Sequence, residues 1–359
     1  MDRDIKIGEK MKILSMLIFS DPRTQGGIQT FGRTLKKFYK EDITLLTVEN
    51  SFKKIYEVEN VKILGSNNIF FRIINKLLKN KLREYLIKKE VGKTNWDIII
   101  FSFPYELEIL KDIKTKKIMV QHFNFDKFIP NIEKMKKLVK DLSYYVVLSP
   151  YDKKKFVEGF NIPEEKVVVI RHTCNIEILN DKKQKNKKLI MIARIDNQQK
   201  RFDLAIKAMK KLSDFTLDIY GDIYSQKDME YLEKLIKKEN IQNVNFKGGT
   251  KNIQEKLDES GIFIMTSDYE GYPISTIEAI RRGLPLIIRN TFDSAKDIIV
   301  NNQNGVLLEK EWNEDKFIEA VRKIYDDYEC YSKNSIILGK RYNIEEIKKK
   351  WDKIIKEKK

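Results

Sequence analysis

Two glutamates, Glu270 and Glu278, stand eight positions apart around a loop that contains glycine and proline. A predicted strand, Ile262–Met265, ends just before this loop, and a helix is predicted to begin near Ser275. The unpaired amides of a first helical turn bind phosphate oxygens, and the hydroxyls of Ser275 and Thr276 add donors. The two carboxylates can accept hydrogen bonds from sugar or ribose hydroxyls. A solvated helix glutamate would explain Glu278 alone, but the whole constellation favours a site for a sugar attached to phosphate.

Two cations, Arg194 and Lys200, follow a second predicted strand, Leu189–Ala193. The carboxyl ends of strands in an open α/β sheet border the crevice where ligands bind, so we expect both side chains to be exposed there. A guanidinium grips two phosphate oxygens at once, and an ammonium adds a point charge. In a chain with a formal net charge of +17, solvated surface cations are the competing explanation.

Two adjacent glycines, Gly26 and Gly27, close the loop between the first predicted strand and a helix that begins near Ile28. Glycines let the backbone approach a ligand closely, and the start of a helix offers amides to an anion. A tight strand-to-helix turn explains the pair equally well. The loop, residues 20–27, matches neither the G-x-G-x-x-G fingerprint nor the G-x-x-x-x-G-K-S/T phosphate loop. Dinucleotide-dependent hydride transfer and P-loop ATP hydrolysis are therefore disfavoured.

Short apolar runs that alternate with longer amphipathic stretches must position these residues. The alternation predicts parallel strands joined by helices, and it restarts near residue 189, which indicates two doubly wound, Rossmann-like α/β domains. We predict domains at residues 1–174 and 175–342, joined through a polar linker, Asn175–Lys188. Strands are predicted at Lys12–Phe19, Ile43–Val48, Val61–Leu64, Asp97–Phe103, Lys117–Gln121, Tyr144–Leu148, Val167–Ile170, Leu189–Ala193, Thr216–Tyr220, Val244–Lys247, Ile262–Met265, Leu284–Ile288 and Gly305–Leu308, with helical spacing at Ile28–Tyr39, Ile69–Lys89, Ile132–Asp141 and Tyr151–Phe160.

The length, composition and charge of the chain favour some classes of protein and disfavour others. A chain of 359 residues with 42% hydrophobic side chains fits about two ordinary domains. No apolar run approaches the ~18 residues of a membrane-spanning helix, and two cysteines, Cys174 and Cys330, indicate a reducing compartment rather than a disulfide framework. With only His122 and His172 present, a histidine-rich metal centre is disfavoured. The positive charge favours anionic partners such as nucleotides, nucleic acid or acidic lipid.

The residues described above resemble those of the retaining glycosyltransferases of the GT-B fold, family 4. Glu270 and Glu278 stand as the E-x7-E motif of that family, and Arg194 and Lys200 match its diphosphate-binding pair. The resemblance extends over nearly the full chain and is strongest over residues 189–308. Further matching features are the glycine loop Gly26-Gly27, the pair Asn304-Gly305 before a late strand, and a closing helix from Tyr342 to Trp351.

The resemblance implies transfer of a hexose or N-acetylhexosamine, with retention, from a UDP-linked donor to a hydroxyl acceptor, in surface polysaccharide or glycoconjugate assembly. It implies two Rossmann-like domains that face each other across a cleft, a C-terminal helix at residues 343–359 that packs back on the first domain, and neither a metal nor another cofactor. Glu270 would hold the donor sugar and Glu278 the ribose. The implied catalytic residues are Glu270, His122, Arg194 and Lys200, and the implied donor-binding residues are Gly26, Gly27, Arg194, Lys200, Gly271, Tyr272, Ile274, Ser275, Thr276 and Glu278.

The sequence departs from the family pattern in two places. Residues 170–175 replace the usual entry to the interdomain linker, and Pro273 lacks an amide that members with glycine there offer. A metal-binding or catalytic pair of His172 and Cys174 explains the first departure less well than ordinary linker chemistry does.

Three other functions compete with sugar transfer. A non-catalytic GT-B partner subunit would be expected to lack Glu270, Arg194 or Lys200, and all three are present. A GT-B sugar-nucleotide epimerase would share the donor site, but it would not release free nucleoside diphosphate during turnover with an acceptor. A nucleic-acid binder is suggested by charge alone, without a recognised motif.

The residue pattern of segment 69–89 predicts that this segment contacts an anionic membrane peripherally, on the cytoplasmic face of that membrane. At helical spacing this segment has one apolar and one basic face. The competing explanation is a helix whose apolar face packs on its own sheet while the basic residues are merely solvated. The apolar face comprises Phe70, Ile74, Leu77, Leu78, Leu82 and Tyr85, and the basic face comprises Arg72, Lys76, Lys79 and Arg83.

Overall fold

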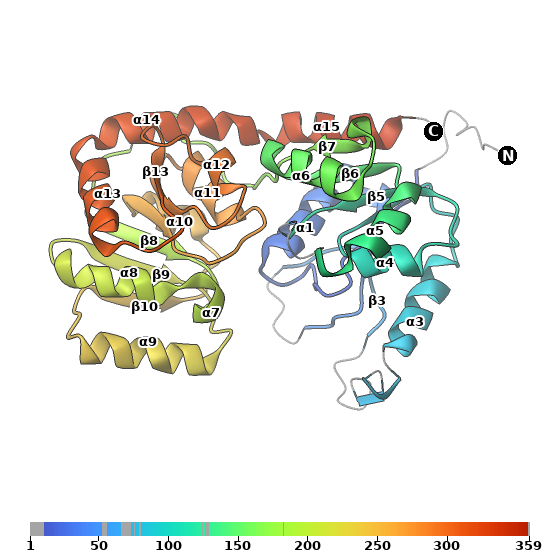
Figure 1. Ribbon diagram of the computed structural model, residues 1–359, viewed down its shortest axis with the longest axis horizontal. Coiled ribbons are helices and arrows are strands. Elements are labelled where there is room, and N and C mark those ends of the chain that lie inside the picture. Colours follow the sequence, from blue (N-terminus) through green and yellow to red (C-terminus); the bar gives the residue numbers. More distant parts are fainter. Residues whose placement is uncertain are drawn as a thin grey trace. The chain divides into compact units, whose positions relative to one another are not determined.

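The computed structural model describes residues 11–51, 56–65, 73–74, 76–78, 80–123, 125, 129–181 and 183–357 (Figure 1). The chain divides into two compact units. Unit 1 contains the described residues before Leu148, together with residues 153–170 and 348–357, and unit 2 contains residues 148–152 and 171–347. The chain therefore passes between the units at the 170/171 and 347/348 junctions, apart from a short excursion at residues 148–152.

Seven parallel strands form the sheet of unit 1, in the order β3-β2-β1-β4-β5-β6-β7. Most of these strands are apolar runs buried on both faces, as expected of a parallel sheet. The strands are β1 (Ile13–Met16), β2 (Ile43–Thr47), β3 (Val61–Ile63), β4 (Ile98–Phe101), β5 (Lys116–Val120), β6 (Tyr144–Val147) and β7 (Val167–Val169), and the accompanying helices are α1 (Gly27–Tyr39), α3 (Lys81–Val91), α4 (Pro104–Ile109), α5 (Ile132–Leu138), α6 (Pro150–Phe160) and α15 (Ile344–Lys356).

Six parallel strands form the sheet of unit 2, in the order β10-β9-β8-β11-β12-β13. The strands are β8 (Lys188–Ile192), β9 (Thr216–Tyr220), β10 (Val244–Gly248), β11 (Ile262–Met265), β12 (Leu286–Arg289) and β13 (Gly305–Leu308), and the helices are α7 (Asn197–Lys200), α8 (Phe202–Ala208), α9 (Gln226–Lys238), α10 (Ile253–Asp258), α11 (Ile274–Arg281), α12 (Ala295–Ile298), α13 (Glu314–Asp326) and α14 (Tyr328–Gly339).

The strand order reverses once in each sheet. In unit 1 the chain builds outward from β1 to β3 and then returns to place β4 on the other side of β1. In unit 2 it builds from β8 to β10 and then places β11 on the other side of β8. Loops that leave the carboxyl ends of two such strands run to opposite faces, so a crevice opens between them. The two reversals mark where ligand-binding residues are expected.

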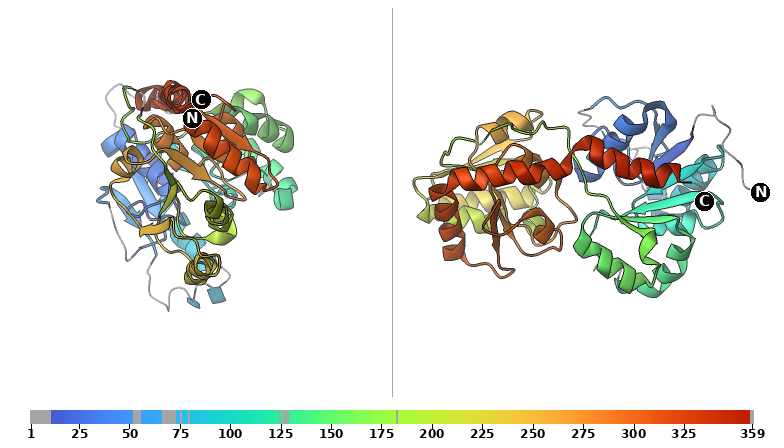
Figure 2. Two further views of the ribbon diagram at one scale, coloured as in Figure 1. Left: turned by 90° about the vertical axis from the view of Figure 1, so that its left-hand side faces the viewer. Right: turned by 90° about the horizontal axis from the view of Figure 1, so that it is seen from above.

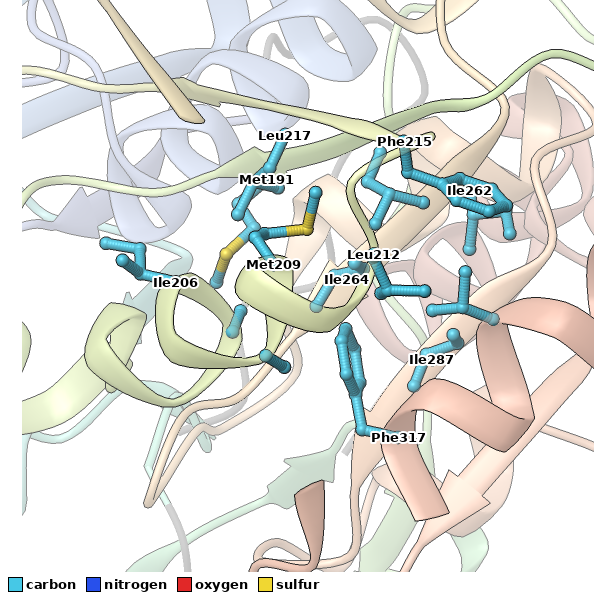
Figure 3. Packing of buried hydrophobic residues seen from close by; sticks show 14 of the residues in the cluster. Met191, Ile206, Met209, Leu212, Phe215, Leu217, Ile262, Ile264, Ile287 and Phe317 are labelled. Carbon is cyan, nitrogen blue, oxygen red and sulfur yellow. The ribbon is translucent and has the colours of Figure 1, made fainter. Parts of the chain in front are cut away.

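Alternate residues of the central strands in unit 2 pack on opposite faces of the sheet. Ile262 and Ile264 of β11 belong to one hydrophobic cluster (Figure 3), whereas Phe263 and Met265 belong to a second cluster that includes Ile277 of α11. Burying each such side chain contributes about 1.5–3 kcal/mol. The anchored face of α11 therefore fixes the start of this helix close to the end of β11.

The closing helix α15 packs on unit 1, alongside α1 and β5 (Figure 2). The side chain of Asn343 accepts hydrogen bonds from the amides of Glu345 and Glu346 and so starts the helix. Further along, the Tyr39 hydroxyl donates to Asp352 at 3.1 Å, and Lys116 Nζ donates to the carbonyl of Glu357 at 2.6 Å. Lys116 thus satisfies an orphan carbonyl at the C-terminal end of the helix.

All thirteen strands of the described residues were predicted from the sequence, with ends that differ by up to three residues. The single helix expected over residues 69–89 is wrong for the part that is described. Asn80 adopts a left-handed backbone with φ of 69°, and α3 begins only at Lys81. Leu77 and Tyr85 are exposed instead of packing on the sheet. The spacing alone carried no sign of this interruption, because asparagine is tolerated in a helix pattern. Phe70, Arg72 and Lys79 lie outside the described residues.

Glu106 of α4 generates a prediction about pH and stability. Its Oε2 atom accepts hydrogen bonds from the amides of Ser102 and Phe103 at 2.9 and 2.6 Å, while Oε1 has no partner among the described residues. Burial raises the pKa of Glu106 to about 8. Because this folded-state pKa lies above the unfolded value, stability is full at low pH and falls as the pH rises towards 8.

We expect Glu106→Gln to remove this dependence, so that the variant gains stability relative to the wild type between pH 5 and pH 8.5. Urea unfolding midpoints at the two pH values measure the change. Glu108→Gln, at a half-exposed position on the same helix, is the control and should parallel the wild type. Parallel profiles for Glu106→Gln and the wild type would contradict the prediction.

Candidate active site

An ion pair bridges the strand-order reversal of unit 2. Lys200 Nζ lies 2.6 Å from an oxygen of Glu270, and the two side chains are only 13% and 9% exposed. Lys200 ends α7, which follows β8, and Glu270 lies in the loop after the neighbouring strand β11. The expectation that Lys200 is exposed is therefore wrong. An ammonium this deeply placed requires a counter-charge, and Glu270 provides it.

Hydrogen bonds between the two loops hold this pair in place. The amide of Asp268 donates to the carbonyl of Gln199 at 2.8 Å, and the side-chain amide of Gln199 donates to the carbonyl of Tyr269 at 2.9 Å. The hydroxyl of Thr266 donates to the carbonyl of Lys200 at 2.9 Å. The backbone that carries Lys200 is thus tied to the backbone that carries Glu270, and the ion-pair geometry does not depend on two flexible side chains alone.

Asp268 links three segments beside the ion pair. Arg201 has a left-handed backbone with φ of 51°, which is uncommon for a residue other than glycine. Its guanidinium contacts Asp203 at 3.1 Å and Asp268 at 3.2 Å. Asp268 also pairs with Arg289, at the end of β12, at 2.7 Å. The left-handed turn at Arg201 directly follows Lys200, and these ion pairs offset the cost of that turn.

Arg194 is the exposed cation of the site, with 49% of its side chain accessible. Its guanidinium lies 3.1 Å from Asp196 and donates to the side-chain oxygen of Gln199 at 2.7 Å. The ring of Tyr224, which follows β9, lies 4.7 Å from the guanidinium carbon. Three neighbours therefore orient a planar fork at the carboxyl edge of the sheet, and such a fork is suited to two oxygens of a phosphate.

The start of α11 lies directly after the Glu270 loop. Ser275 and Glu278 are half-buried, so their side chains remain accessible. Thr276 is fully buried, and its hydroxyl donates to the carbonyl of Pro273 at 2.6 Å. The expectation that the Thr276 hydroxyl binds phosphate is therefore wrong, because the first turn of the helix already uses it.

The side chains of Tyr272 and Ile274 are also turned into the core, so these residues offer only backbone atoms to a ligand. Gly271 is half-buried and holds its position through its carbonyl, which accepts a hydrogen bond from the Ser294 hydroxyl at 2.6 Å. The donor-binding roles assigned to these three residues stay predictions, restricted to their main chain.

The carboxylate of Asp297, in α12, accepts hydrogen bonds from side chains of three other segments of unit 2. It accepts a bidentate hydrogen bond from Arg171 at 2.7 and 2.8 Å and another from Arg341 at 2.7 Å. The Tyr272 hydroxyl donates to the same carboxylate at 2.9 Å and lies 2.8 Å from the hydroxyl of Tyr342. Burial of the Tyr342 ring raises its pKa to about 12, so both phenols stay protonated at neutral pH.

His172 and Cys174, in the first departure from the family pattern, and the matching pair Asn304-Gly305 are all buried. Burial lowers the pKa of His172 to about 4 and raises the pKa of the Cys174 thiol to about 12, so neither side chain is a base or nucleophile near neutrality. Asn304 is fully buried and accepts from the amide of Val300, and a Cβ at Gly305 would lie 2.2 Å from the carbonyl oxygen of Leu286. Both therefore serve the packing of β13.

The remaining predicted site residues lie in unit 1. Gly26, with φ of 153°, precedes the first residue of α1, and a Cβ added at Gly27 would meet no atom of the described chain within 4 Å. The helix start is thus open on that side. His122 follows β5, is largely buried, and has its ring 4.8 Å from that of Phe31. The catalytic role of His122 stays a prediction.

Four residues that shape the site were missed in the sequence: Gln199, Tyr224, Asp268 and Asp297. Tyr224 had a usable signal, since it follows a predicted strand at the ligand-binding edge. The other three act by holding neighbours distant in sequence, and no motif marks such a role. Across the residues that the structure describes, no group of three or more histidine, cysteine, aspartate or glutamate side chains is arranged to hold a metal ion, and no helix has the length and apolar character needed to cross a bilayer.

Comparisons with known proteins find similarity to glycosyltransferases. Residues 176–351 match the family model of the glycosyl transferases group 1. An uncharacterized glycosyltransferase of Haemophilus influenzae is 25% identical over 84% of this chain and 92% of its own length. The O-antigen biosynthesis glycosyltransferase WbnH of Escherichia coli is 28% identical over 62% of each chain. The crystal structure of Anabaena HepE in complex with UDP and glucose is 16% identical, with a TM-score of 0.79 over 97% of this chain and 100% of that one, and shares the GT-B fold.

The ion pair generates a prediction about stability. Removing one member of a largely buried pair leaves the other charge without compensation, so we expect Lys200→Ala and Glu270→Ala each to lower the free energy of unfolding by about 3 kcal/mol. The double variant should lose less than the sum of the two. Arg194→Ala, at a half-exposed position, should change stability by about 0.5 kcal/mol or less. Denaturant titrations of the wild type, the two single variants of the pair and the double variant give the coupling energy, and additive losses would contradict the prediction.

Proposed function

We propose that this chain, whose residues 176–351 match the family model of the glycosyl transferases group 1, is a glycosyltransferase that transfers a hexose or N-acetylhexosamine from a UDP-linked donor to a hydroxyl acceptor. Transfer retains the configuration at the anomeric carbon and proceeds on one face of the sugar, as in the family 4 enzymes that the chain resembles. The reaction breaks the bond between the sugar and the β-phosphate, so negative charge develops on the leaving diphosphate.

The observation that carries this proposal is the cation pair at the strand-order reversal of unit 2. Lys200 is held against Glu270, and Arg194 is oriented by Asp196, Gln199 and Tyr224. A diphosphate placed at this edge meets two cations and the amides at the start of α11, which together stabilise the charge of the leaving group. In this proposal Glu270, which is paired with Lys200, accepts hydrogen bonds from hydroxyls of the donor sugar.

Lys200 also separates two negative groups in this scheme. A diphosphate beside an unpaired Glu270 carboxylate would be repelled, and this repulsion is strong away from bulk water. An ammonium between the two offsets both charges. Glu278, on the accessible side of α11, is assigned to the ribose.

Two of the comparisons support a UDP-linked donor and a role in polysaccharide assembly. The HepE structure named above contains UDP and glucose, and WbnH acts in O-antigen biosynthesis. We therefore assign a UDP-linked donor and a role in surface polysaccharide (capsule or exopolysaccharide) or glycoconjugate assembly. Catalysis is proposed to need no metal ion, because two cations and a helix start already meet the leaving group.

We expect Arg194→Ala to reduce the turnover of a UDP-sugar by about 10²–10³, the loss typical of removing one charge-stabilising donor. UDP release from UDP-glucose, UDP-galactose and UDP-N-acetylglucosamine, each with a panel of methyl glycosides as acceptors, provides the measurement. Addition of EDTA should leave the rate unchanged, and the product should have the anomeric configuration of the donor.

Arg322→Ala is the matched control, because Arg322 lies in the same unit, is 44% exposed and is paired with Asp214 away from the site. Equal rates for Arg194→Ala and Arg322→Ala would remove the assignment of the diphosphate site. Interconversion of the sugars without UDP release would instead indicate the epimerase.

Peripheral contact with an anionic membrane is proposed for the segment before and within α3. Ile73, Ile74, Leu77 and Leu78 are all exposed, and 76% of the Leu77 surface is accessible. The exposed cations Lys76 and Lys81 lie in the same segment. Clustered apolar side chains with adjacent lysines fit a headgroup region, where each cation contributes about 1 kcal/mol.

We expect Lys76→Glu combined with Lys81→Glu to reduce co-sedimentation with vesicles that contain phosphatidylglycerol, without affecting UDP binding. Retention of the wild type should also fall as salt is added, because the attraction is screened. Lys237→Glu combined with Lys238→Glu, two exposed positions on α9 of unit 2, is the control. Sedimentation that ignores lipid charge and both substitutions would refute the membrane contact.

A further inference from the structure

Three phenylalanines line the carboxyl edge of the sheet in unit 1. Phe19 follows β1, Phe103 follows β4 and Phe123 follows β5, which are consecutive strands of the sheet. The ring centroids of Phe19 and Phe103 are 5.1 Å apart, and those of Phe103 and Phe123 are 5.4 Å apart. Phe19 and Phe103 therefore stand on either side of the strand-order reversal between β1 and β4, where an open α/β sheet presents its ligand crevice.

These three rings are not part of the buried hydrophobic core of unit 1. None of the three belongs to the buried cluster of unit 1, in which Phe101, Phe156 and Phe160 are fully or almost fully covered. Phe19 keeps 36% of its surface exposed, and Phe103 and Phe123 are half-buried. Contact with solvent is unfavourable for three large rings, and their mutual packing only partly relieves it. Such an arrangement is expected where a ligand completes the packing.

Polar atoms accompany the rings. Ser102 Oγ, Tyr105 Oη and Glu106 Oε1 are buried and have no hydrogen-bond partner among the described residues. Tyr105 belongs to the same aromatic group, since its ring centroid is 5.5 Å from that of Phe19. Glu106 lies against the segment that carries Phe103, because its Oε2 accepts from the amide of Phe103 at 2.6 Å. Buried polar groups without a partner are rare and call for a water or a ligand hydroxyl.

We propose that Phe19, Phe103 and Phe123 form a platform on which a pyranose ring of the acceptor stacks, with the hydroxyls of that ring directed at Ser102, Tyr105 and Glu106. The proposal rests on the proposed sugar transfer and adds where, and against which residues, the acceptor binds. A pyranose has an apolar C–H face that fits an aromatic ring and a rim of hydroxyls that needs donors and acceptors. An alkyl chain would fit the rings and leave the three polar atoms unmatched.

Burial favours the protonated form of the Glu106 carboxyl group, which can donate a hydrogen bond. Because desolvation raises the pKa of Glu106 to about 8, its carboxyl group keeps a proton at neutral pH and can donate as well as accept. The Arg83 guanidinium lies 4.9 Å from the centroid of Phe19 and steadies that ring. His122, the residue before Phe123, places the predicted catalytic histidine next to the platform.

The test measures acceptor and donor parameters separately, with a panel of methyl pyranosides as acceptors. We expect Phe19→Ala and Phe103→Ala to raise the KM for the acceptor at least tenfold, while the Kd for UDP and the slow hydrolysis of the UDP-sugar by water stay unchanged. Phe19→Tyr, which keeps the ring, should restore the acceptor KM. Phe38→Ala, at a half-buried phenylalanine near the C-terminal end of α1, is the control for loss of a ring in the same unit.

A direct binding measurement keeps the proposal falsifiable if the alanine variants fold poorly. In Phe103→Trp, addition of a methyl pyranoside should shift the tryptophan emission, and decyl phosphate should not. An unchanged acceptor KM in both alanine variants would overturn the proposal, and so would an emission shift with decyl phosphate alone. If the wild type neither transfers sugar nor hydrolyses any UDP-sugar, the proposed function fails, and the binding measurement still decides whether the platform holds a pyranose.

Discussion

The largely buried pair of Lys200 and Glu270 imposes the strongest constraint on unit 2. Removing two opposite charges from water costs several kcal/mol per ion, and their attraction returns this only when the geometry is good. The surrounding loops meet that condition through main-chain hydrogen bonds, so that residues 70 positions apart meet at 2.6 Å. The left-handed turn at Arg201 and the ion pairs of Asp268 follow from the same requirement. A site built in this way is organised before a ligand arrives, which is the condition for electrostatic stabilisation of a leaving group.

The two sheets use the same topological device with different chemistry. Each reverses its strand order once, and each places its distinctive side chains on the two loops that flank the reversal. In unit 2 these are Lys200 and Glu270, which suit an anion and the sugar attached to it. In unit 1 they are Phe19 and Phe103, which suit an uncharged ring. The proposed division of labour between donor and acceptor therefore corresponds to a difference in local polarity that can be read from the contacts themselves.

The short apolar runs of the strands made the fold predictable. The local environment of each site residue could not be predicted in the same way. Parallel strands buried on both faces are short apolar runs, and the Leu189–Ala193 and Ile262–Met265 runs gave both the sheet and the position of its ligand edge. Exposure was harder to predict. Lys200 and Arg194 both follow the same strand, β8. The side chain of Lys200 is largely buried beside Glu270, 70 residues away in the sequence, whereas that of Arg194 is exposed. The helix pattern over 69–89 failed at Asn80, because a left-handed residue leaves no trace in apolar spacing.

Asp297 connects the Glu270 loop to the rest of unit 2. One carboxylate accepts hydrogen bonds from Arg171, Arg341 and Tyr272, so a single buried group restrains three segments at once. Arg171 is the first residue after one passage of the chain between the units, and Arg341 precedes the other passage. Tyr272 lies two residues after Glu270. A shift of the Glu270 loop would therefore change the hydrogen bonds of both segments that lead to unit 1. Because charge-assisted hydrogen bonds are about twice as strong as neutral ones, the hydrogen bonds to Asp297 oppose such a shift.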